Sequence, residues 1–177
     1  MSNILPFKNM VDRHPGLIDC VEALYKYSAS VVLDKHHNSP QEFSLKDDNN
    51  DYNVRLEWEK PDERTKSALA NLTDSKEAGA YGIALAAVEY SRGYVAVRRA
   101  EELTGSDYYV APAGSKLDDL EEAYRLEVSG SELNESKVKR VLSNKLEQAK
   151  NGKSDLPAIA AVVGFAVKLI LVQTLEK

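Results

Sequence analysis

Residues 105–110 read Gly-Ser-Asp-Tyr-Tyr-Val, and residues 124–130 read Tyr-Arg-Leu-Glu-Val-Ser-Gly. Both stretches favour a β-strand, because aromatic and β-branched residues are common in them. Each also contains an acidic residue, Asp107 in the first and Glu127 in the second. A carboxylate within an apolar strand is costly unless something compensates it. Since acidic residues on neighbouring strands can bind a divalent cation together, the two stretches predict a site as well as a sheet.

The elements expected around these strands indicate an α/β fold with a mixed central sheet flanked by helices. From residue 74 the predicted order is helix, strand, strand, strand, helix and strand, over residues 74–91, 94–97, 105–110, 124–130, 134–151 and 157–165. The second of these helices can start at Asn134 or at Ser136. Asp74 followed by Glu77 resembles a helix-capping arrangement, and Gly93 is expected to end that helix. The last helix joins an outer strand to an apolar one, which is typical of a parallel crossover.

The chain of 177 residues is expected to form a single domain, with residues 1–73 as an N-terminal extension of a core over residues 74–177. Residues 15–36 predict a helix with Pro15 in its first turn. Residues 38–50 are polar and predict a loop. The alternation of apolar and polar residues over 52–59 predicts a half-buried strand.

Composition restricts the setting in which the protein works. The net charge of −5 argues against nucleic-acid binding through the overall field, although a local basic patch is compatible with it. The sequence has one cysteine and no N-terminal signal pattern, so a cytoplasmic location is expected. The apolar stretch 156–172 contains Lys168 and is shorter than the ~20 residues of a membrane-spanning helix, so it predicts buried strands and no membrane partner. His14, His36 and His37 lack zinc-ligand spacing and are expected at the surface.

The order of elements, with Asp107 at the second strand and Glu127 at the third, resembles the PD-(D/E)XK superfamily, the restriction-endonuclease-like fold. The resemblance covers residues 74–165. It implies that Asp107 and Glu127 hold Mg²⁺, or Mn²⁺ in its place, and that Glu77 matches an extra acidic metal ligand of some members. The implied activity is that of a metal-dependent nuclease (phosphodiesterase) acting in phage defence or in a mobile-element system.

The sequence departs from this family where the motif requires a lysine two residues after the glutamate. Ser129 stands there and cannot supply a positive charge. Some members provide the lysine from the following helix, where Lys145 falls within the apolar stripe and Gln148 borders it. The resemblance therefore implies a catalytic set of Asp107, Glu127, Lys145 and Gln148. A basic rim for nucleic-acid phosphates is expected from Lys137, Lys139, Arg140, Lys150 and Lys153.

Each of these residues also has a structural interpretation, and the sequence leaves the alternatives open. Asp107 follows Thr104-Gly105-Ser106, so it can belong to a turn that precedes a strand. Glu127 can pair with Arg125 or Arg98 across the sheet. Lys145 can extend its amine from the edge of the apolar stripe to solvent.

A second function also stays open. The chain also resembles small bacterial proteins that have no settled activity. The resemblance lies in Gly-x-Asp-Tyr at 105–108, Arg-Leu-Glu-Val-Ser-Gly at 125–130 and Leu-Pro-Ala at 156–158. Its small size, its acidic charge and Ser129 are compatible with a catalytically degenerate nuclease-fold module. Such a module would act as a protein-binding subunit, antitoxin or immunity-type protein. The N-terminal amphipathic helix would then be the surface for a protein partner or a homodimer.

Overall fold

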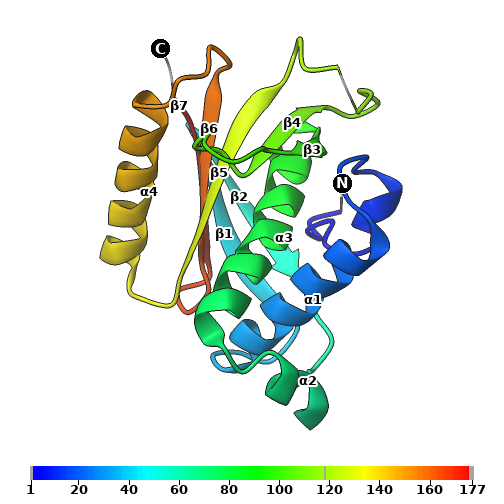
Figure 1. Cartoon of the computed structure of the whole chain (residues 1–177). Helices are drawn as coiled ribbons and strands as arrows, with labels where there is room; N and C mark the ends of the chain where they lie inside the picture. Colours follow the sequence, from blue (N-terminus) through cyan, green and yellow to red (C-terminus); the bar gives the residue numbers. More distant parts are fainter. Residues whose placement is uncertain (1, 118, 176–177) are drawn as a thin grey trace.

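The apolar run at 158–164 forms a fully buried strand near the centre of a mixed sheet. A computed structural model describes residues 2–117 and 119–175, and within them the sheet has seven strands in the order β2-β1-β7-β6-β5-β4-β3 (Figure 1). The strands are β1 (Gln41–Asp47), β2 (Asn50–Leu56), β3 (Tyr94–Arg99), β4 (Tyr108–Pro112), β5 (Tyr124–Ser131), β6 (Ala158–Gly164) and β7 (Leu169–Leu175). The helices are η1 (Met10–Asp12), α1 (Asp19–Asp34), α2 (Glu63–Ala68), α3 (Leu72–Arg92) and α4 (Glu135–Lys150).

The sheet combines an antiparallel half with a parallel crossover, as the sequence predicts. Strands β3, β4 and β5 follow one another in antiparallel pairing. Helix α4 then carries the chain to β6, which pairs with β5 in the parallel direction. Strand β7 pairs with β6 antiparallel, and β1 joins β7 in parallel, so that the N-terminal β1–β2 hairpin extends the same sheet. The predicted mixed α/β architecture is confirmed.

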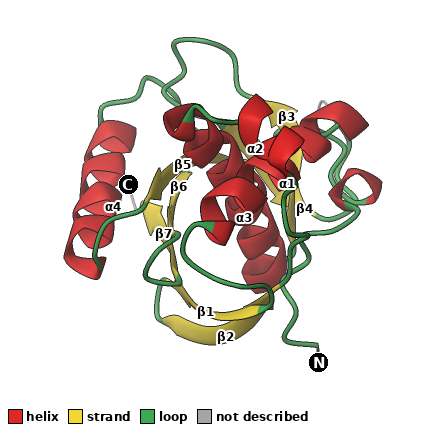
Figure 2. Cartoon of the chain, turned by 90° about the horizontal axis from the view of Figure 1, so that it is seen from below, coloured by secondary structure: helices red, strands yellow, loops and turns green. Residues whose placement is uncertain are grey.

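The sheet curves around α3 and leaves α4 on its outer side (Figure 2). On β6 and β7, Ala161 and Ile170 belong to the main core with α3, whereas Val162 and Leu171 pack with Val138 of α4. Because successive side chains of a strand point to opposite faces, covering both faces requires an almost continuous apolar run. This accounts for the composition of residues 158–164. No helix within residues 2–117 and 119–175 is long and apolar enough to cross a membrane.

The N-terminal segment contacts both edge strands of the sheet. Arg55 of β2 exchanges backbone hydrogen bonds with residues 3–5, at 2.7 and 2.9 Å. At the other edge, Gly16 donates to the carbonyl of Ala96 in β3, and the Ala96 N–H donates to Nδ1 of His14 at 2.9 Å. His14 is fully buried, with Nε2 2.7 Å from Glu89 of α3, so the prediction of a surface histidine was wrong. Its two ring nitrogens secure the segment to both β3 and α3.

Three local predictions were also wrong. Residues 41–47 form β1 rather than a loop, because Phe43 and Leu45 alternate with polar residues and are completely buried. Helix α1 begins at Asp19, so Pro15 lies before it. Helix α3 is capped by Asn71, whose Oδ1 accepts from the N–H groups of residues 73 and 74, rather than by Asp74 and Glu77. Gly93 ends α3 with a left-handed φ of 68°, as predicted.

We expect Gly79→Ala to destabilise the fold. A Cβ at residue 79 would lie 2.7 Å from Cα of Ala29, so α1 and α3 would have to separate. Overpacking of this kind outweighs the gain in helix propensity, for a net loss of roughly 1–2 kcal/mol. Urea denaturation measures the difference. Thr73→Ala at an exposed position of α3 is the control, and equal stability of the two variants would contradict the tight crossing.

Candidate functional site

Glu127 lies in the middle of β5 and faces α4. Its neighbours Leu126 and Val128 point into the main core beneath α3, so the pleat directs Glu127 to the opposite face of the sheet. Only 3% of Glu127 is exposed. A buried carboxylate in a central strand is costly to retain, which makes this residue the natural starting point of a site.

Asp107 is fixed immediately beside Glu127 by hydrogen bonds. Its backbone N–H donates to the carbonyl of Leu126 at 2.9 Å, and its Oδ2 accepts from the N–H of Val128 at 2.7 Å. Asp107 thus bonds to both residues that flank Glu127. Because it directly precedes β4, its side chain satisfies a backbone donor of β5 where the β4 ladder ends. The backbone of Asp107 lies in a bend before β4, as the alternative of a turn predicts, and its carboxylate lies close enough for its charge to act on Glu127.

A pocket of about 510 Å³ brings together the four residues of the proposed catalytic set. Asp107 and Glu127 line it from the sheet, and Lys145 and Gln148 line it from α4. Lys145 is half-buried and Gln148 is exposed, one helical turn apart. The apolar stripe of α4 packs on the sheet through Val138, Val141, Leu142, Leu146 and Ala149. Residues 99–103 and 105–106 complete the lining.

The carboxyl group of Glu127 has an unusual electrostatic setting. Among the residues that the structure describes, Oε1 of Glu127 is buried without a hydrogen-bond partner. Burial raises the pKa of Glu127, the positive charge of Lys145 opposes this rise, and the negative charge of Asp107 adds to it. Lys145 therefore acts on Glu127 as a nearby cation, and one oxygen of this buried carboxylate has no hydrogen-bond donor among the described residues.

Both arginines considered as partners of Glu127 make other interactions. Arg125 is fully buried and donates to the carbonyl oxygens of Leu156, at 3.1 Å, and of Ala149, at 3.4 Å. The guanidinium thus covers the C-terminal end of α4, where carbonyl groups lack helical partners. Arg98 forms an ion pair with Glu101 at 2.5 Å.

Glu77 is connected to Asp107 indirectly. The hydroxyl oxygen of Tyr81 lies 2.9 Å from Oε1 of Glu77 and 3.0 Å from Oδ1 of Asp107. A phenol has one proton, so it donates to one carboxylate at a time. Burial, followed by the charge of Asp107, raises the pKa of Tyr81, which keeps the phenol protonated. Glu77 itself lines a neighbouring hollow on the α1 side of α3, next to Tyr25 and Ser28.

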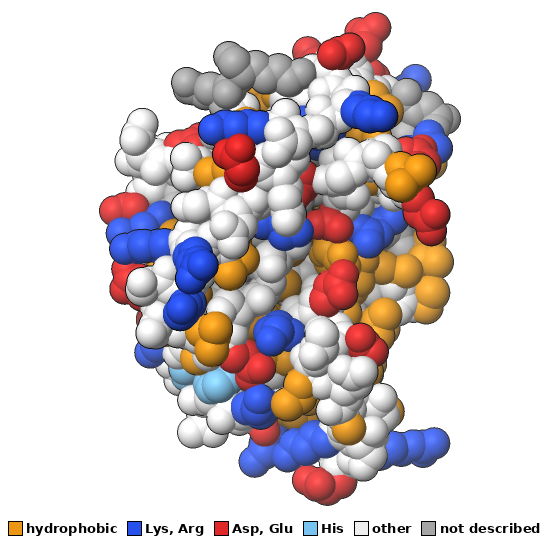
Figure 3. All heavy atoms as spheres, turned by 60° about the vertical axis from the view of Figure 1, so that its left-hand side comes forward, with side chains coloured by type: hydrophobic (Ala, Val, Ile, Leu, Met, Phe, Trp, Pro, Cys, Tyr) orange, Lys and Arg blue, Asp and Glu red, His pale blue; other side chains and the backbone are white. Residues whose placement is uncertain are grey.

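The residues predicted as a basic rim are exposed on α4 and just beyond it. Lys139 pairs with Glu135 at 2.9 Å and Lys150 with Glu147 at 3.8 Å. Lys137, Arg140 and Lys153 are exposed as well. Figure 3 views the side of the molecule that carries α4 and shows basic and acidic side chains interspersed there. The rim is therefore a mixed surface whose lysines are partly neutralised.

The pocket offers few protein ligands for a divalent cation. No group of three or more His, Cys, Asp or Glu suited to a metal occurs within residues 2–117 and 119–175. Mg²⁺, however, is commonly bound through one or two carboxylates and completes its shell with water and substrate phosphate. Asp107 and Glu127 line one pocket and are the two carboxylates that could hold such an ion.

Tyr81 and Arg99 are the parts of this site that sequence reasoning missed. Arg99 lines the pocket, and its guanidinium lies over the rings of Tyr81 and Tyr108, at 4.6 and 5.0 Å from their centroids. The available signal was the position of Arg99 at the end of a strand whose loop leads directly to Asp107. Its stacking partners come from α3 and β4, so the cage itself required the tertiary structure.

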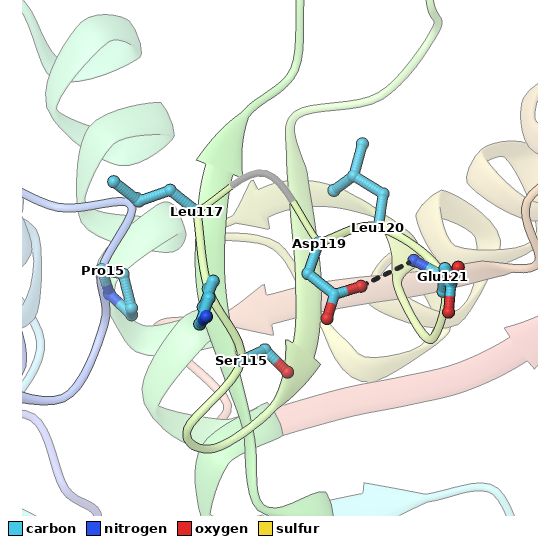
Figure 4. Close-up of a pocket in the computed structure, with 7 residues that line it drawn as sticks. Pro15, Ser115, Leu117, Asp119, Leu120 and Glu121 are labelled. Carbon is cyan, nitrogen blue, oxygen red and sulfur yellow. Dashed lines mark hydrogen bonds between the residues drawn. The ribbon is translucent and has the colours of Figure 1, made fainter.

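A larger hollow of about 800 Å³ lies away from these residues. It is lined by Pro15 and by the connection between β4 and β5, including Ser115, Leu117 and Asp119 (Figure 4). The Asp119 carboxylate accepts from the N–H of Glu121 at 3.3 Å, which is a local turn contact. The hollow shows neither a buried charge nor an orphaned polar atom, among its described lining residues, that would point to chemistry.

Comparison with known proteins gives no significant match to a protein-family model, a curated protein or a solved structure.

We expect Glu127→Gln to stabilise the protein at pH 8. Because burial raises the pKa of Glu127, the folded state holds this proton more tightly than the unfolded state. The stability that Glu127 contributes is present below its pKa in the unfolded state, about 4.3, and is lost as the pH rises through its pKa in the folded state. At pH 8 the folded protein buries the charged carboxylate, so Glu127→Gln should raise the free energy of unfolding by on the order of 1 kcal/mol.

Thermal melts at pH 5 and pH 8 check this expectation. The stability gain of Glu127→Gln should be larger at pH 8 than at pH 5. Glu42→Gln at an exposed position of β1 serves as the control and should change little at either pH. If Glu127→Gln and wild type have the same melting temperature at pH 8, burial of this charge carries no cost.

Proposed function

We propose that this protein is a metal-dependent nuclease, a phosphodiesterase of the restriction-endonuclease-like type. The observation that carries the proposal is that Glu127, whose buried Oε1 has no hydrogen-bond partner among the described residues, lines one pocket with Asp107 and Lys145. The antiparallel β3–β4–β5 unit followed by the parallel crossover to β6 supports the same assignment, because it has the order and pairing expected of that core.

Each residue of the pocket has a task in this proposal. Asp107 and Glu127 hold the cation, and a Mg²⁺ or Mn²⁺ ion bound there supplies Lewis-acid activation of a phosphoryl oxygen and a bound water of lowered pKa. Lys145 places a positive charge beside Glu127, the contribution that Ser129 cannot make from the motif position. Gln148 presents an amide at the mouth of the same pocket, where it can orient water or a phosphate oxygen.

Tyr81 contributes to the site by orienting Asp107. Its hydroxyl contacts Oδ1, while the N–H of Val128 contacts Oδ2, so both carboxylate oxygens are held in place. A carboxylate fixed in this way requires little rearrangement to bind a cation. Glu77 is the alternative acceptor for the phenol proton and places a second negative charge on α3. The basic residues of α4 are assigned to nucleic-acid phosphates further from the reacting bond.

We expect nuclease activity that requires Mg²⁺ or Mn²⁺ and both strand carboxylates. Supercoiled plasmid, linear duplex DNA, single-stranded DNA and RNA are the substrates to compare. Asp107→Asn and Glu127→Gln should each lower the rate by on the order of a hundredfold or more, and Lys145→Ala should lower kcat. Lys46→Ala, at an exposed position of β1 outside the pocket and the basic rim, is the matched control for Lys145.

Metal binding gives a second measurement that does not depend on choosing the right substrate. Mn²⁺ should raise the melting temperature of the wild type and leave that of Asp107→Asn unchanged, because a ligand stabilises the state that binds it. Nuclease activity that survives both carboxylate substitutions would place the chemistry elsewhere.

We also propose a second candidate, a protein-binding module on the same fold, because α1 exposes apolar side chains. Leu24 and Tyr27 are 47% and 53% exposed on that helix, and Ile18 directly before it is 61% exposed. Light scattering should then report a homodimer that Leu24→Lys dissociates and that Asp19→Asn, a polar change on the same helix, leaves intact. A wild-type monomer that captures no partner from its native host would exclude this role.

A further inference from the structure

Arg99 reaches Asp107 from the α3 side of the sheet, opposite to the side from which Lys145 comes. In the β3–β4 register Arg99 pairs with Tyr108, whose ring belongs to the main core with α3, whereas Arg98 pairs with Tyr109 on the other face. Arg99 and Arg98 thus point to different faces of the sheet. Since Lys145 comes from α4 on the outer face, the pocket has a cation on each side of Asp107 and Glu127.

The guanidinium of Arg99 is held in one orientation. It lies over the rings of Tyr81 and Tyr108, Nη1 donates to the backbone carbonyl of Asp107, and Nη2 donates to the Tyr81 hydroxyl at 3.3 Å. Its Nη1 is also 3.6 Å from Oδ1 of Asp107. Contacts on the aromatic faces and at both terminal nitrogens reduce the entropy lost when a ligand binds.

Arg99 nevertheless keeps capacity for a ligand. Its side chain is 49% exposed and lines the pocket, although it stacks on the buried rings of Tyr81 and Tyr108. A guanidinium has five N–H donors, and the two hydrogen bonds to Asp107 and Tyr81 leave others directed away from them. An arginine that served only to neutralise Asp107 would not need a two-ring cage at a pocket wall.

We propose that Arg99 is a phosphate-binding residue of this pocket, held ready by the cage of Tyr81 and Tyr108. The inference rests on the proposed nuclease function, since it names the group of the substrate that Arg99 contacts. Arginine suits a phosphate because its planar fork matches two phosphate oxygens at once. With Asp107, Glu127, Glu101 and Glu102 around the pocket, an anion needs such a fixed cation to approach.

The same geometry defines the substrate class as an accessible phosphate rather than a base. Arg99 and Lys145 flank the carboxylates from the two faces of the sheet, so the charge pattern across the pocket is positive, negative and positive. A phosphate in this pocket would meet a positive group from either face of the sheet. Contacts of this kind position a nucleic acid without reading its sequence.

The test uses the full chain and inorganic phosphate as the probe, with and without Mg²⁺. Resonances of the arginine Nε–H groups and of the amides of Glu127 and Val128 are followed by NMR during the titration. Wild type and Arg98→Gln should bind phosphate with the same affinity, and Arg99→Gln should bind at least about tenfold more weakly. Arg99→Lys, which keeps the charge and loses the fork, should fall between them. Thermal melts of each variant report on folding.

Each outcome decides the proposal. Equal phosphate binding by Arg99→Gln and Arg98→Gln overturns it, as does a wild type that binds no phosphate under either condition. If Arg99→Gln does not fold, the difference between Arg99→Lys and wild type gives the answer. Phosphate binding that depends on Arg99 in a protein without nuclease activity retains the anion site and refutes the proposed function alone. An adventitious effect of charge would show as equal losses in Arg98→Gln and Arg99→Gln, which also overturns the proposal.

Discussion

The packing of α3 into the concave side of the curved sheet is the constraint on which the rest of the structure depends. α3 buries small side chains in the main core, including Ala80, Ala84 and Ala87, and crosses α1 at Gly79, where the backbones are in close contact. Because the sheet curves around this helix, the N-terminal segment reaches both edge strands. The curvature leaves the outer face to α4, and it is toward that face that β5 presents Glu127.

The candidate site follows from where the strands end. Strand β4 begins one residue after Asp107. The Val128 N–H of β5 therefore donates its hydrogen bond to the Asp107 carboxylate instead of to a backbone carbonyl. This exchange brings a carboxylate to the boundary between the two faces of the sheet. Tyr81 and Arg99 approach that boundary from the α3 side and Lys145 from the α4 side. Three groups distant in sequence thus meet at a position fixed by backbone hydrogen bonding.

Elements with strong periodicity could be predicted from the sequence, and elements defined by partners could not. The apolar stripe of α4, the alternation in β2 and the continuous run of β6 each report which faces are covered. Strand β1 was missed because its buried Phe43 and Leu45 stand in a polar segment and become core residues only beside β7. His14 was missed for the same reason, since its burial depends on Glu89 and the edge of β3.

The local sequence of β5 explains why a lysine from α4 matters to the proposed chemistry. Alternation along the strand puts Arg125, Glu127 and Ser129 on one face, and Arg125 is committed to the carbonyl groups at the end of α4. With serine at 129, Arg125 is the basic residue that β5 places on this face, and its charge lowers the pKa of Glu127 less than the charge of Lys145 does. Lys145 sits on the helix that Arg125 secures to the strand. The arginine therefore acts on Glu127 twice, directly through its charge and indirectly by holding the helix that carries the second cation.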